Sequence, residues 1–301
     1  MIVSLPLLWA CVLCVLCAAS EQLSDECLSS VGGPPERPPA QILEQLTLGG
    51  LVPIQYYYVD DSNKGKGTHY KYSYEDISEM ITQAKTFVSR VLDTPPPPPP
   101  LTHPHTSTWL TQLTDIWLVH ALHRYRVAGL SVCVYGSTSP WYESLLLAMG
   151  AASVTTIEYN RLSYDHPDIT TLVVGEGRGS SMGEGGGLCD RALSLSSFDH
   201  DGLGRYGDPI NPIGDLLAME TVKQDLRSDG LLFLTIPIGL DVVVWNLHRR
   251  YGNHRLPLLL SDWTEVECVG WSAELAQSNV SYTTVYEPVF ILTPKLNTDP
   301  L

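Results

Sequence analysis

The chain has 301 residues, enough for one large α/β domain with a smaller appendage. Its 18 Lys and Arg residues against 33 Asp and Glu residues give a net charge of −15. Nucleic-acid phosphates and anionic membranes repel such a chain, so we exclude both as principal partners.

The first residues are nearly all apolar. Ile2–Ala19 contains no charged residue, and Cys17–Ala19 are small enough for a signal-peptidase site. We therefore predict a signal peptide over 1–19. An uncleaved N-terminal anchor is the alternative for an apolar run of this length. With either, the remaining chain would lie in the secretory lumen or outside the cell, with no membrane contact beyond the N-terminal segment.

Four cysteines follow the signal: Cys27, Cys133, Cys189 and Cys268. Their even number is compatible with disulfides. Cys133 and Cys268 fall inside predicted strands, where a buried free thiol is expected. No pair has CxxC spacing, so no structural zinc site is predicted.

A small extension over 20–94 precedes the main domain. Gly- and Pro-rich sequence predicts irregular chain at first, and periodicity then predicts helices at Ile42–Leu48 and Tyr74–Leu92 with a strand at Ile54–Val59 between them. Pro95–Pro100 is typical of a stiff polyproline II spacer. We therefore predict a linker over 95–106 and an α/β domain over 107–301.

The α/β domain opens with a strand–turn–helix–strand unit. Ser131–Tyr135 predicts a buried strand that stops at Gly136, and Ser139 followed by proline predicts the start of a helix. A second strand ends at Glu158, which lies 22 positions after Gly136. This order is typical of nucleotide-binding folds, in which the helix N-terminus meets a polar ligand and the acid accepts ribose hydroxyls. Gly136, Ser137, Ser139 and Glu158 are thus candidate cofactor contacts. A purely structural turn with a solvated glutamate is the alternative.

Further strands are predicted over Ile169–Val174, Arg191–Phe198, Gly230–Ile236, Thr264–Trp271 and Pro288–Thr293, with a helix over Asp215–Leu226. The glycine-rich stretch Gly175–Gly187 is expected to be a mobile insertion. About seven strands, the last two without an obvious long helix between them, favour a Rossmann-like class I methyltransferase sheet over a dehydrogenase. This is an argument by fold analogy.

Polar residues gather directly after the predicted fourth strand. Ligands of open α/β sheets bind beyond the carboxyl ends of strands, where Asp199 and His200 would project. His200 could act as a general base, oriented by Asp199 or Asp208. Arg205 and Tyr206 are candidate substrate contacts on the same loop. The alternative is a loop held by Asx turns and an Arg–Asp pair. Nothing fixes a ligand count, so no metal is predicted.

Three segments carry a resemblance to a known family: SSFDHDGLGRYGDPINPIGDLLAM, LRSDGLLFLTIPIG and WNLHRRYGNHRLPLLL. From roughly His120 to Trp271 the chain resembles domain-of-unknown-function family 268, which is itself similar to class I S-adenosylmethionine-dependent methyltransferases. The resemblance implies that SSFDH, which includes Ser197, is the strand-end acid–His element beside the cofactor. Arg249 or Arg250, in the third segment, is a further candidate for substrate binding, and a solvated helix face is the alternative.

The sequence therefore predicts a methyltransferase-like domain of the secretory pathway. S-adenosylmethionine is the expected cofactor, and a glycan or protein hydroxyl is the expected acceptor. The alternative is a catalytically silent Rossmann-like interaction domain, favoured by the single glycine of the first turn. A third hypothesis is a nucleotide-sugar enzyme, in which Asp199-His200-Asp201 would bind manganese.

Overall fold

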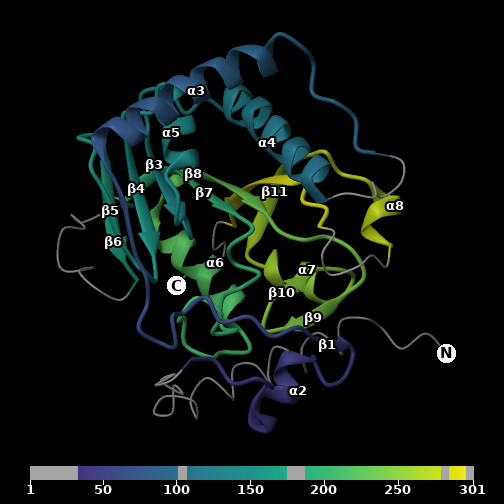
Figure 1. Cartoon of the computed structure of the whole chain (residues 1–301). Helices are drawn as coiled ribbons and strands as arrows, with labels where there is room; N and C mark the ends of the chain where they lie inside the picture. The colour runs from purple at the N-terminus through teal and green to yellow at the C-terminus, as the bar shows by residue number, and fades with distance from the viewer. Residues whose placement is uncertain (1–32, 101–106, 175–186, 279–284, 296–301) are drawn as a thin grey trace, which may run out of the picture.

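The computed structural model describes residues 33–100, 107–174, 187–278 and 285–295 (Figure 1). The predicted signal peptide and Cys27 lie outside these ranges, as does the glycine-rich insertion except for Gly187. Within the described ranges, no helix has the length and apolar character needed to cross a membrane.

The core of the fold is a seven-stranded sheet with the order β11-β12-β8-β7-β3-β4-β6. Strands β6, β4, β3, β7 and β8 pair in parallel, whereas β12 is antiparallel to both of its neighbours. Counted along the chain, the first five strands have the 3-2-1-4-5 order of the Rossmann sheet. The antiparallel β12 lies between β8 and β11. The predicted Rossmann-like methyltransferase sheet is thus confirmed. The strands are β3 (Ser131–Tyr135), β4 (Ser153–Glu158), β6 (Ile169–Val173), β7 (Cys189–Leu195), β8 (Leu226–Thr235), β11 (Trp263–Val269) and β12 (Val289–Pro294).

The central strands are continuous apolar runs because both of their faces are covered. Val132 and Val134 of β3 are each 1% exposed, and Leu232 and Leu234 of β8 are completely buried. Helices α3 and α5 pack on each other, and α5 also packs on β3 and β4. Figure 1 shows α3, α4 and α5 together at one end of the view.

The longest helix carries its start signal in the sequence. Ser73 accepts a hydrogen bond from Asp76 N, and the Asp76 carboxylate accepts one from Ser73 N, which forms a capping box. The predicted Ser139 cap is wrong: the helix after β3 starts at Trp141, with Pro140 as N-cap and no side-chain cap. The helices are η1 (Ala40–Ile42), α2 (Leu43–Leu46), α3 (Tyr74–Leu92), α4 (Ser107–Arg124), α5 (Trp141–Ala148), α6 (Gly214–Asp225), α7 (Arg255–Leu259) and α8 (Ala273–Ala276).

The predicted N-terminal extension is part of the same domain. Strand β1 (Ile54–Tyr56) pairs with β9 (Val242–Trp245), which in turn pairs with β10 (His248–Arg250). Strand β2 (His69–Tyr72) pairs with β5 (Arg161–Tyr164). The polyproline segment is also packed, since Trp117 Nε1 donates to Pro97 O at 2.8 Å. The predicted boundary therefore separates residues that share strand pairs and a core.

One predicted free thiol is wrong. Cys133 and Cys189 form a disulfide between the neighbouring strands β3 and β7, with a Cα–Cα distance of 5.8 Å. Cys268 is a free cysteine, as predicted.

Candidate functional site

A cavity of about 500 Å³, the first cavity, lies at the carboxyl ends of the central parallel strands. Its walls include Tyr135 at the end of β3, Glu158 at the end of β4 and Ser196 after β7. Strand β3 has β4 on one side and β7 on the other, so successive strands are added in opposite directions from this point. Ligands of open α/β sheets bind at such a topological switch point. The first cavity therefore occupies the expected ligand position.

The turn after β3 packs closely on the next part of the site. Gly136 has a φ of +72°, and a Cβ there would lie 1.8 Å from Ser197 Oγ. Glycine is required because a side chain would both strain the backbone and displace Ser197. Gly136 and Ser197 both line the first cavity, where cofactor contacts were predicted.

The two other serines predicted as cofactor contacts hold the turn instead. Ser137 Oγ donates to Ser139 O at 3.0 Å and lies 3.1 Å from Glu143 Oε2. Neither serine is among the described residues that line the first cavity, whereas Thr138 is. The cofactor role of Ser137 and Ser139 is thus corrected to a structural one.

Residues Ser196–Asn211, the site loop, are organised by the buried Asp208. Its carboxylate accepts hydrogen bonds from the backbone amides of Gly202 (2.8 Å), Gly204 (2.9 Å) and Tyr206 (3.3 Å). Burial raises the pKa of Asp208 in spite of these bonds. With both oxygens engaged in loop amides, Asp208 is a positioning residue rather than the predicted catalytic one.

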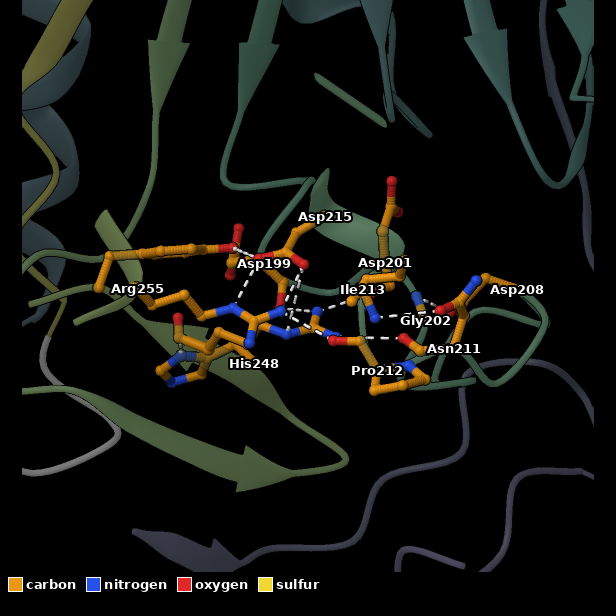
Figure 2. Close-up of polar contacts among 12 residues, drawn as sticks. Asp199, Asp201, Gly202, Asp208, Asn211, Pro212, Ile213, Asp215, His248 and Arg255 are labelled. Carbon is orange, nitrogen blue, oxygen red and sulfur yellow. Dashed lines mark hydrogen bonds and ion pairs between the residues drawn. The ribbon is translucent and has the colours of Figure 1, made fainter. Parts of the chain in front are cut away.

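A buried charge network supports the site loop from β10 and α7 (Figure 2). Arg255 donates to both oxygens of Asp215, at 2.8 and 2.6 Å. Arg249 is completely buried and donates to the backbone oxygens of Asp199 and Asp201. Arg249 is not among the described residues that line the first cavity, nor does it line a second cavity that lies next to His200. Its predicted substrate contact is therefore replaced by a structural role, the positioning of the loop.

Acidic side chains give the first cavity its electrostatic character. Glu158 Oε1 accepts hydrogen bonds from the backbone amide and the side-chain amide of Asn160, at 3.2 and 3.0 Å. Burial raises the pKa of Glu158, and burial together with Asp208 raises that of Asp201 well above its ordinary value. Figure 2 shows the Asp201 carboxyl pointing away from the guanidinium groups. None of the described residues that line this cavity is Lys or Arg.

His200 stands between this cavity and another. A second cavity, of about 330 Å³, shares Ser196 and His200 with the first. His200 Nδ1 contacts Leu247 O, and since a carbonyl only accepts, Nδ1 carries the proton and Nε2 the lone pair. Burial is the main cause that lowers the pKa of His200, so its ring is neutral near pH 7. Nε2 is therefore a proton acceptor at the junction of two cavities.

The predicted site residues thus divide into three groups. The first cavity is lined by Gly136, Glu158, Ser197, His200, Tyr206 and Asp208. The second cavity is lined by Asp199, His200 and Arg205. Ser137, Ser139 and Arg249 belong to the supporting structure.

Sequence reasoning missed several residues of the site. Ser196 lines both cavities and has a φ of +45°, which is uncommon for a residue with a side chain. Burial raises the pKa of Glu287 to about 8, and its carboxyl interacts with Ser196 and Asp199. Tyr57 lines the second cavity from the N-terminal segment. Glu287 directly precedes the predicted last strand, and this position was the one feature of the sequence that could have pointed to it.

Comparisons with known proteins concern the fold. The ribosomal protein L11 methylase from Lactobacillus delbrueckii subsp. bulgaricus is 13% identical over 61% of this chain and 79% of its own, with a TM-score of 0.35. The PH0226 protein from Pyrococcus horikoshii OT3 is 13% identical over 64% of this chain and 93% of its own, with a TM-score of 0.41. No curated protein is similar enough to count as a relative.

A family model covers the segment that carries most of this geometry. It matches residues 129–281, from the start of β3 to beyond α8, and includes the site loop with its supporting arginines. These 153 of 301 residues make up half of the chain. The chain therefore belongs to the family described as Caenorhabditis protein of unknown function, DUF268.

Proposed function

We propose that this protein binds S-adenosylmethionine in the first cavity and methylates a hydroxyl group presented from the second. The observation that carries the proposal is the lining of the first cavity. Glu158, Asp201 and Asp208 contribute three carboxyl groups, and no Lys or Arg accompanies them among the described lining residues. Phosphate-bearing ligands are disfavoured in such a site, whereas a cationic, hydroxyl-bearing ligand is favoured.

The residues present fit such a ligand. Glu158 ends β4 at the position where an acid accepts ribose hydroxyls in Rossmann-like folds. Asp201 offers a carboxyl group to the positive charges of the ligand. Thr138, in the turn after Gly136, also lines the cavity and adds a hydroxyl group. When bound, S-adenosylmethionine supplies an electrophilic methyl group.

The chain's own contribution to chemistry is proton transfer. The fixed tautomer of His200 leaves the Nε2 lone pair available, and the neutral ring can take the proton of an acceptor hydroxyl. Asp199 Oδ2 lies 3.5 Å from Nε2, so its negative charge would stabilise the imidazolium that forms. The shared walls at Ser196 and His200 would exclude bulk water between the two sites.

We further propose the lumen of the secretory pathway as the location. Disulfides form and persist in oxidising compartments, and the Cys133–Cys189 bond supports that setting. A glycan or protein hydroxyl remains the proposed acceptor.

The alternatives have less support. A nucleotide-sugar enzyme needs basic groups or a metal for the diphosphate, yet within the described ranges no three His, Cys, Asp or Glu side chains form a metal-binding group. A silent interaction domain would gain nothing from buried carboxyl groups around a cavity, because their burial costs free energy.

Calorimetric titration of the oxidised protein with S-adenosylmethionine and S-adenosylhomocysteine tests the proposal. We expect saturable binding that Glu158→Gln weakens at least about tenfold, or 1.4 kcal/mol. Glu220→Gln, at an exposed position of α6, is the matched control. Absence of binding by folded protein, or a preference for NAD or a nucleotide sugar, would overturn the proposal.

A further inference from the structure

The second cavity has the features of a separate ligand site. It lies beyond His200 from the first cavity, and its walls come from the site loop, the loop after β9 and the segment Tyr57–Ser62, which we call the strap. Its volume of about 330 Å³ is within the range of small-molecule sites. No residue of this cavity other than Ser196 and His200 also lines the first cavity.

Asp199 is one of the residues that line this cavity, and its buried carboxylate has unused acceptor capacity. The residue is 0% exposed, and neither carboxylate oxygen accepts a hydrogen bond from any described residue. His200 Nε2 lies 3.5 Å from Asp199 Oδ2, which is beyond the usual hydrogen-bond distance. A buried acceptor without donors is costly, so a ligand that brings donors would remove that cost.

The charges around the cavity favour a ligand without net charge. Arg205 lines the same cavity as Asp199, and its guanidinium is held by Asp61 at 2.7 Å. Asp199 would attract a cationic ligand but Arg205 would repel it, and an anionic ligand would meet the reverse. Either charge therefore loses part of its attraction to the cavity. Hydroxyl groups donate to the carboxylate and accept from the guanidinium without this conflict.

The strap adds one aromatic side chain to the cavity and is fastened at several points. Tyr57 N donates to Trp245 O at 2.7 Å, and Val59 exchanges two hydrogen bonds with the Asn246 side chain, at 2.9 and 2.8 Å. Asp61 N donates to Arg205 O at 2.9 Å, next to the Asp61–Arg205 ion pair. Tyr57 lines the cavity and is 43% exposed. An exposed aromatic ring beside a polar pocket suits a sugar, which has an apolar C–H face and hydroxyls on its edge.

We propose that the second cavity binds a neutral sugar residue, with Asp199 accepting hydrogen bonds from its hydroxyls and Tyr57 packing against its ring face. The inference rests on the proposed function only in calling this sugar the methyl acceptor. Sugar binding itself requires no cofactor.

The test uses the full oxidised chain without cofactor and a panel of monosaccharides. The neutral probes are the methyl glycosides of glucose, galactose, mannose and xylose, and the charged probes are glucosamine and glucuronate. Binding is measured by saturation-transfer NMR and calorimetry. We expect saturable binding of at least one neutral probe, weakened at least about tenfold by Asp199→Asn and by Tyr57→Ala. Tyr57→Phe keeps the ring and should bind normally, as should Tyr74→Ala, which removes an exposed tyrosine of α3.

Several results would overturn the inference: no binding of any probe, preference for glucosamine or glucuronate, or binding that the folded Asp199 and Tyr57 variants retain. Thermal unfolding confirms that each variant is folded. Parallel titration with S-adenosylmethionine separates the two proposals. Sugar binding without cofactor binding would leave this inference standing and remove methyl transfer, and the converse result would remove only the sugar.

Discussion

Two buried aspartates of the same region have opposite surroundings. Asp215 accepts hydrogen bonds from Arg255 and from Tyr251 Oη at 3.0 Å. Burial alone would raise its pKa, but Arg249 and Arg255 outweigh burial and lower it. Asp199 is just as buried, yet its carboxylate oxygens accept no hydrogen bond from the described residues.

The difference separates structural acids from functional ones. A carboxylate whose partners are supplied by the chain holds elements together, here α6, β10 and α7 around the site loop. A carboxylate without partners costs folding free energy, and in the proposal above a ligand supplies the missing donors. The same division sets Asp208, bonded to three loop amides, apart from Asp201 at the cavity wall.

The largest effect should come from removing the satisfied acid. Asp215→Ala leaves Arg249 and Arg255 buried without a counter-charge, so we expect a loss of roughly 3–5 kcal/mol in the free energy of unfolding. Urea titration measures this loss. Asp229→Ala, at an exposed position of β8, is the control and should change little. A loss below about 1 kcal/mol for Asp215→Ala would show that the network is not structural.

Asp199→Asn should have the opposite profile. The amide keeps the shape but cannot stabilise a protonated His200, so methyl transfer to a sugar hydroxyl should fall roughly 100-fold. Unfolding free energy should be unchanged or higher because a buried charge is gone. A destabilisation as large as that of Asp215→Ala would break the comparison.

Glu287 tests the cost of a buried acid through the pH dependence of stability. Burial first, then Asp199, raise its folded pKa to about 8, from an ordinary value of 4.5. Between these values the folded state binds more protons, so stability should fall as pH rises. Glu287→Gln does not titrate, so we expect the variant to be more stable by on the order of 2 kcal/mol at high pH and the slope to be shallower. Urea titrations at about pH 5 and about pH 8 measure the free energy of unfolding of both proteins. The same dependence on pH in the variant and the unchanged protein would contradict the prediction.

The smallest effect concerns His200. Burial is the main cause of its lowered pKa, and Arg205 contributes in the same direction. Arg205→Gln should therefore raise the pKa of His200 only slightly, because burial, the main cause of the lowering, remains. NMR titration of the imidazole ring measures the change, with Arg227→Gln, at an exposed position of β8, as control. A fall in the pKa of His200 would show that the Arg205 guanidinium does not act on the imidazole ring as assigned.

The sheet was predictable because its strands are apolar runs buried on both faces, as in Ser131–Tyr135. Strands β2 and β5 were not, since each is partly exposed and carries tyrosine and basic residues. The pairing of β1 with β9 was not predictable either, because it joins residues that are far apart in the chain.

The location of a side chain could be predicted where strand ends decide it, as for Glu158 and His200, which line the first cavity. It failed where side-chain direction decides. Ser137 and Arg249 lie beside the site in sequence, but their polar atoms point into the protein. The cross-strand disulfide was equally hidden, because register between β3 and β7 is not visible in the residues.

The strap lies outside the part of the chain that the family match covers. The family match spans 129–281 and thus contains Glu158 and His200, but Tyr57 and Asp61 lie before it. All described residues that line the first cavity thus lie within the matched region, whereas Tyr57 completes the proposed sugar site from outside it. A change in the strap would alter the proposed sugar site and leave the matched region unchanged.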